Sequence, residues 1–140
     1  MKILQFAFDS REESDYLPHN YTHNCVVYTG THDNDTVMGW YDTLKGADKK
    51  LCDDYQRLKN ADGEPIPREQ LPWEFVRAAM SSVADLAIIP MQDYLELDSS
   101  ARINTPSTLG CNWKWRMDKN ALDPKLAKKI YKMAKLYARV

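Results

Sequence analysis

Three short apolar segments, each followed by polar residues, constrain the fold of this chain more than any other feature. They cover residues 3–8, 25–29 and 86–91. Runs of this length that are apolar almost throughout are typical of β-strands covered on both faces, as in a parallel sheet. The polar residues that follow them are Asp9, His32, Asp33, Gln92 and Asp93. Because α/β proteins carry their chemistry at the carboxyl edge of the sheet, the sequence predicts a functional site there.

Helical patterns fill much of the chain between and after these strands. We expect helices over residues 35–44, 48–58 and 72–82, and a strongly amphipathic helix from residue 123 onward. Asp123 is a favourable N-cap residue for the last helix. The apolar stripe of that helix consists of Leu126, Ile130, Met133, Ala134 and Tyr137. Alternating strands and helices predict an α/β fold with a parallel sheet.

The length of the chain limits how complete this fold can be. Its 140 residues fit one domain, whereas a complete eightfold barrel needs about 250 residues. Three strands cannot close such a barrel, so we expect either a small open sheet or a piece of a larger fold. A buried-type strand follows Met1 almost directly, with no helix before it, and this favours a piece.

Charge and cysteine content narrow the range of partners and compartments. Nineteen basic and twenty acidic residues leave a formal charge of -1, so there is no electrostatic case for nucleic acid or an anionic membrane. The three cysteines are widely spaced without a C-x-x-C pair, which predicts free thiols in a reducing compartment. The N-terminus does not resemble a signal peptide and no apolar run could span a bilayer, so a cytoplasmic protein is expected.

The segment from Thr31 to Thr36 places an imidazole, two carboxylates and an amide directly after a buried strand. One interpretation is a carbohydrate site, where a carboxylate and an imidazole grip sugar hydroxyls and the carboxylate favours developing positive charge. A second is a metal site, which the absence of a second ligand cluster disfavours. A third is purely structural, with Asp35 and Thr36 capping a helix. Capping explains Asp35 well and the pair His32–Asp33 less well.

Several motifs, in order along the chain, resemble those of the 4-alpha-glucanotransferases of glycoside hydrolase family 77. Residues 26–36, read VVYTGTHDNDT, followed by Gly39, Trp40 and Tyr41, resemble the family's most distinctive segment. Residues 2–8 resemble the preceding barrel strand and 16–21 its following loop. Residues 87–93 resemble the last barrel strand, and 102–108 with 112–116 resemble the terminal loop. Together these motifs cover nearly the whole chain.

The resemblance implies a retaining transglycosylase on a TIM (β/α)8 barrel, acting in maltodextrin, starch or glycogen metabolism. Residues 1–140 would form a single partial glycoside hydrolase barrel domain with the last three strands and the C-terminal helix. Such an enzyme moves an α-1,4-glucan segment to the 4-hydroxyl of an acceptor, and its partners are α-1,4-glucans and maltooligosaccharides. The resemblance implies no cofactor and no metal. The family's nucleophile and acid/base belong to earlier strands, so the isolated chain is expected to be inactive.

Residue by residue, the resemblance makes Asp33 the transition-state stabiliser and His32 its partner in binding sugar hydroxyls. Asn104, His19 and Asn20 lie in matched motifs and are predicted to contact substrate, although the Asn104 amide fits a bond to its own loop backbone equally well. Asp93 is expected to orient loop groups.

Other residues of the chain leave alternatives open. Trp113 and Trp115 stack on glucose or pack within the barrel, and packing is favoured. Ser107 and Cys111 replace glycines that are common in the family, which bears on loop geometry. A non-catalytic glucan-binding or interaction module is the alternative function. Open sheet edges predict self-association or pairing with an N-terminal part of the barrel.

Overall fold

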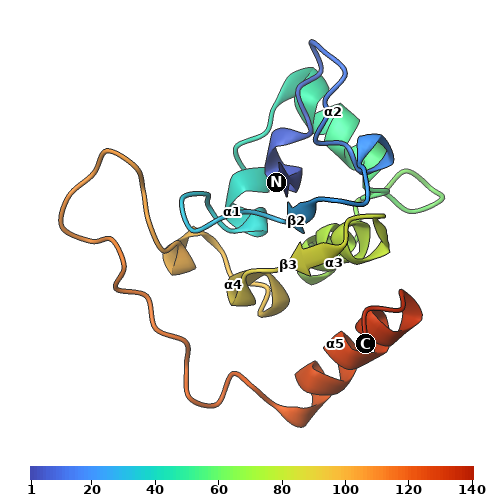
Figure 1. The fold of residues 1–140 in the computed structure, drawn as a ribbon. Coiled ribbons are helices and arrows are strands. Elements are labelled where there is room, and N and C mark those ends of the chain that lie inside the picture. Colours follow the sequence, from blue (N-terminus) through green and yellow to red (C-terminus); the bar gives the residue numbers. More distant parts are fainter.

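The computed structural model describes all 140 residues, and its sheet consists of three short parallel strands (Figure 1). The strands β1 (Lys2–Ile3), β2 (Val26–Tyr28) and β3 (Leu86–Ile88) are neighbours in sequence order. Ile3 lies opposite Tyr28, and Tyr28 lies opposite Ile88. Because opposed residues of parallel strands point to the same face, these three side chains share one face. The predicted α/β fold with a parallel sheet is confirmed.

Five α-helices accompany the sheet. They are α1 (Val37–Tyr41), α2 (Gly46–Tyr55), α3 (Leu71–Ser81), α4 (Met91–Tyr94) and α5 (Pro124–Leu136). Thr36 caps α1 by accepting a hydrogen bond from the Gly39 N–H, and Asp123 caps α5 by accepting one from the Leu126 N–H. Both caps satisfy backbone donors that a helix leaves unpaired in its first turn. None of the helices is both long and apolar enough to traverse a membrane.

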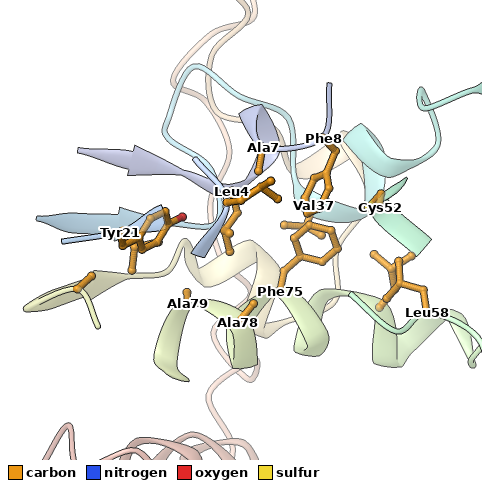
Figure 2. Packing of buried hydrophobic residues seen from close by; sticks show 14 residues of the cluster. Leu4, Ala7, Phe8, Tyr21, Val37, Cys52, Leu58, Phe75, Ala78 and Ala79 are labelled. Atoms are coloured by element: carbon orange, nitrogen blue, oxygen red, sulfur yellow. The ribbon is translucent and has the colours of Figure 1, made fainter. Parts of the chain in front are cut away.

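The main hydrophobic core lies between one face of the sheet and helix α3 (Figure 2). Phe75 of α3 is fully buried, and its ring lies 5.9 Å from the Phe8 ring and 5.6 Å from the Trp40 ring. Val27 of the central strand and Val37 of α1 are also fully buried in this cluster. The core therefore fixes α1, and the loop before it, against the sheet.

The opposite face of the sheet is open. Leu86 and Ile88 are 51% and 42% exposed, and Phe6 beyond β1 is 49% exposed. The prediction that the strands are covered on both faces is therefore wrong for this chain. The strands are apolar, as the sequence predicts, but helices cover only the side that carries Val27 and Ala87.

Two predicted strands are shorter than expected, and each turns into a helical segment. The segment predicted as a strand over residues 3–8 leaves the sheet after Ile3 and forms a 3-10 turn at Leu4–Phe6. This turn buries Leu4 fully and lets the Gln5 side chain reach the Asp35 carbonyl oxygen at 2.8 Å. The segment predicted over residues 86–91 leaves the sheet after Ile88, and Pro90 precedes α4. Tertiary contacts override strand propensity in both places.

Helix α5 follows a long excursion without helix or strand, from residue 102 to residue 123, and returns to pack on α3 (Figure 1). Its predicted apolar stripe contacts the buried side chains of Trp73, Val76 and Met80. The Arg139 guanidinium then donates hydrogen bonds to the carbonyl oxygens of Met80 and Ser82 at 2.7 and 2.9 Å. Because the last carbonyls of a helix lack intrahelical partners, Arg139 completes the C-terminus of α3.

Candidate functional site

A cavity of about 670 Å³ lies at the carboxyl ends of the three strands. Ile3, Tyr28 and Ile88 form its floor, and Arg102 and Ile103 of the long excursion form part of its wall. Residues 30–36 and 89–93 form most of the remaining wall, together with Met1 and Phe6. His32, Asp33, Gln92 and Asp93 all line this cavity, as the sequence predicts for the polar ends of the strands. Asp9 does not line it and pairs with Arg11 instead.

A tight turn sets the position of the His32–Asp33 pair. The Asn34 N–H donates to the Thr31 carbonyl oxygen at 3.1 Å. The Asn34 side-chain oxygen in turn accepts from the Thr31 N–H and hydroxyl at 2.9 and 2.8 Å. Because these bonds close the turn on both sides, His32 and Asp33 project from a braced loop rather than a loose one. Their side chains are 55% and 49% exposed and thus accessible to a ligand.

Three side chains surround the Asp33 carboxylate and its backbone. His32 Nε2 lies 3.3 Å from Asp33 Oδ1, and the Asn104 amide donates to the same oxygen at 2.6 Å. The Arg102 guanidinium donates to the Asp33 carbonyl oxygen at 2.6 Å and to the Asn104 carbonyl oxygen at 2.9 Å. Arg102 thereby ties the two residues together through their backbones. Asn104 therefore bonds Asp33, which is neither the predicted contact with substrate nor the predicted bond to its own loop backbone.

The loop is also held from behind by Gln5, which follows β1, and by Ser99, which begins the 3-10 turn Ser99–Ala101. Gln5 donates to the Asp35 carbonyl oxygen, and Ser99 donates to the Asp35 carboxylate at 2.6 Å. Gly30 lies so close to Gln5 that an added Cβ would stand 2.6 Å from Gln5 Nε2. A side chain at residue 30 would therefore push Gln5 away from the loop. These supports make the geometry around Asp33 preorganised.

Asp93 is the buried anchor of this arrangement. Its carboxylate accepts hydrogen bonds from the Thr29 hydroxyl at 2.5 Å and from the Val37 N–H at 2.9 Å, and the residue is 1% exposed. It thus joins the end of β2 to the start of α1, the two elements that flank the His32–Asp33 turn. Burial raises the pKa of the Asp93 carboxyl from 3.8 to about 6, although both hydrogen bonds act in the opposite direction.

The raised pKa predicts a specific pH dependence of stability. The folded chain holds the Asp93 proton more tightly than the unfolded chain, so ionisation disfavours the folded state. The free energy of unfolding should therefore decrease, by on the order of 1–3 kcal/mol, as pH rises from about 4 to about 7. Urea denaturation across this range measures it, with Asp93→Asn as the reference. If the free energy of unfolding depended on pH identically in the wild type and in Asp93→Asn, the raised pKa of Asp93 would be contradicted.

Two predicted substrate residues lie outside the cavity. His19 Nδ1 lies 2.9 Å from the Tyr55 hydroxyl, and the Asn20 amide donates to the Ser14 carbonyl oxygen at 3.1 Å. Neither residue lines the space next to Asp33. Their contact with substrate stays a prediction.

Sequence reasoning missed Arg102 and Gln5 and misjudged Trp113. Arg102 begins the terminal-loop segment 102–108, but nothing in the sequence shows that its guanidinium reaches the Asp33 backbone. The sequence favours packing for Trp113, yet the residue is 58% exposed and its ring centroid lies 5.1 Å from that of His32. No group of three or more His, Cys, Asp or Glu side chains is placed to hold a metal ion.

Comparisons with known proteins agree with this geometry. The family model described as 4-alpha-glucanotransferase matches residues 1–122. The chain is 46% identical to the 4-alpha-glucanotransferase of Clostridium butyricum over 99% of its own length and 27% of the relative's. It is 44% identical to the chloroplastic/amyloplastic enzyme of Oryza sativa subsp. japonica, covering all of this chain and 23% of that protein.

A solved structure shows the same arrangement of elements. The amylomaltase of Streptococcus agalactiae in complex with acarbose superposes with a TM-score of 0.84 at 35% sequence identity. The match covers 99% of this chain and 27% of that one. The chain thus spans about a quarter of the length of the relatives it matches.

Proposed function

Because the chain belongs to the 4-alpha-glucanotransferase family, we propose that it forms the Asp33 side of an active site that transfers α-1,4-glucan segments. In this proposal a segment moves from a donor glucan to the 4-hydroxyl of an acceptor glucan or glucose, with retention of configuration. The observation that carries the proposal is the accessible Asp33 carboxylate at the cavity wall, within 3.3 Å of His32 Nε2. Two groups so placed can bind neighbouring hydroxyls of one glucose ring.

The role of Asp33 follows from the charge that develops during transfer. Cleavage of a glycosidic bond passes through an oxocarbenium-like transition state, which carries positive charge at the sugar ring. A fixed carboxylate nearby stabilises that state more than the uncharged ground state. Asn104 and Arg102 hold Asp33 in place before substrate binds, so little reorganisation is needed.

Retaining transfer requires a nucleophile and an acid/base as well, usually two carboxylates about 5 Å apart. We assign neither role to a residue of this chain, because its other carboxylates do not lie in the family's motifs for them. The proposal places both groups on strands of the longer relatives that this chain does not match. The three parallel strands then form the end of a (β/α)8 barrel, and the exposed Leu86 and Ile88 face its interior.

The open sheet face supports this arrangement. Each of β1 and β3 has one hydrogen-bonded neighbour, so the sheet has two open edges, and Leu86 and Ile88 of β3 are exposed on its open face. Such edges pair readily with other chains. We propose that the rest of the barrel occupies them in the longer protein and that the isolated chain self-associates. Light scattering that shows a stable monomer at high concentration would count against this.

A hybrid enzyme tests the proposed function. In it, residues 1–140 replace the matching quarter of the Clostridium butyricum relative. We expect the hybrid to convert maltotriose into glucose and longer maltooligosaccharides, and the isolated chain to yield neither. Product analysis by chromatography measures both.

Three other outcomes would change the account. A folded hybrid without transfer activity overturns the proposed function. Turnover by the isolated chain shows that its own carboxylates suffice. Glucan binding without turnover, at an affinity insensitive to Asp33→Ala, favours a non-catalytic binding module instead.

A further inference from the structure

Trp113 presents a large aromatic face to solvent beside the proposed site. The residue is 58% exposed, and its ring is tilted 36° to the His32 ring at a centroid distance of 5.1 Å. His32 lines the cavity next to Asp33. The indole therefore extends the wall of the site outward, past the residue that is proposed to hold a glucose hydroxyl.

The backbone at Trp113 adopts a conformation that bulky residues rarely take. Its φ is 64°, in the left-handed region where the Cβ of an ordinary residue crowds the backbone. The Trp113 N–H donates to the Ile103 carbonyl oxygen at 2.8 Å, and its own carbonyl oxygen accepts from Arg116 at 3.2 Å. Local strain of this kind persists where the surrounding structure enforces it, and it concentrates at functional sites.

The loop that leads to Trp113 is braced by the preceding residue. The Asn112 side-chain oxygen accepts from the Thr105 N–H at 2.9 Å, and its amide donates to the Thr108 carbonyl oxygen at 3.0 Å. These bonds close the loop from residue 105 to residue 112. Since Ile103 lines the cavity and bonds Trp113 directly, the indole is held at a set place relative to the site.

We propose that Trp113 is a stacking platform for a glucose unit of an α-1,4-glucan that passes beside His32. The inference rests on the proposed function for its choice of ligand. The C–H groups on a glucose face carry partial positive charge, which favours the negative face of an indole ring. The exposed ring and the strained backbone are both unfavourable in a merely structural residue. A ring that is held in position to bind a ligand accounts for both.

The 140-residue chain itself tests this proposal by NMR titration with maltoheptaose. We expect the Trp113 indole N–H signal, assigned by its loss in Trp113→Phe, to shift on binding. Trp113→Gly should weaken binding at least about tenfold, and Trp113→Phe should weaken it less. Leu109→Ala, at a 99% exposed position of the same loop, should bind as the wild type does.

Thermal denaturation of the same variants separates a binding role from a packing role. Glycine adopts φ near 64° without strain, so Trp113→Gly should melt at or above the wild-type temperature. A melting temperature of Trp113→Gly well below that of the wild-type chain would show that the ring packs, and would overturn the proposal. So would an unmoved Trp113 signal, or wild-type affinity in Trp113→Gly.

Failure here and failure of the proposed function can be told apart. Stacking on the chain requires no turnover, so a negative titration leaves the transfer activity of the hybrid enzyme intact. Conversely, a shifted Trp113 signal with an inactive hybrid overturns only the proposed transfer function. Cellohexaose, whose glucose units are β-linked, serves as the ligand control and should shift the Trp113 signal less.

Discussion

Replacing Asp33 by asparagine in the hybrid enzyme is expected to lower kcat for maltotriose about a thousandfold. The change removes one negative charge and keeps the shape of the side chain. The side-chain oxygen of the asparagine can still accept from the Asn104 amide, so the loop geometry should persist. The loss should therefore fall on the transition state, with a much smaller change in KM.

Asp62→Asn is the matched control for this prediction. Asp62 is exposed on a turn and does not line the cavity, and the substitution is chemically identical. We expect its kcat to equal that of the unmodified hybrid. If the two substitutions lowered kcat equally, or if Asp33→Asn lowered it less than about tenfold, the proposed role of Asp33 would be wrong.

The second large effect concerns stability and arises at Asp93. We expect Asp93→Ala to be about 3 kcal/mol less stable than Asp93→Asn, because two buried groups lose their hydrogen-bond partner at roughly 1–3 kcal/mol each. Those groups are the Thr29 hydroxyl and the Val37 N–H. In Asp93→Asn the amide oxygen accepts from Val37, and the amide nitrogen donates to the Thr29 oxygen.

Urea denaturation of the 140-residue chain measures this difference directly. Both variants lack the carboxylate, so the comparison removes the unfavourable burial of charge from the result. If the free energies of unfolding of the two variants agreed within about 1 kcal/mol, Asp93 would not be an anchor for α1 and β2. The comparison of these two variants also bears on the candidate site, since the turn with His32 and Asp33 lies between β2 and α1.

The sequence predicted the order and type of most elements because local patterns determined them. Apolar runs located β2 and β3, and N-cap residues located the starts of α1 and α5. Prediction from the sequence failed where contacts between distant residues determined the backbone conformation. At Leu4–Phe6, for example, the chain turns to bury Leu4 and to direct Gln5 toward Asp35. Helix α4 after Pro90 was missed for the same reason.

The candidate site shows the same division. His32 and Asp33 are adjacent in sequence, so a motif could locate them and their cavity. The partners of Asp33 come from residues about seventy positions later, and no local pattern shows that Arg102 reaches its backbone. The exposure of Trp113 depends on the path of a long excursion that has neither helix nor strand, and the sequence favoured packing instead.

A crystal structure of the hybrid enzyme with acarbose tests the central claim most directly. Acarbose is a suitable probe because the amylomaltase of Streptococcus agalactiae was solved in complex with it. The account predicts one sugar ring whose hydroxyls lie within hydrogen-bond distance of both His32 and the Asp33 carboxylate. Acarbose bound with its rings away from Asp33, and Asp33 still bonded only to Asn104 and His32, would contradict it.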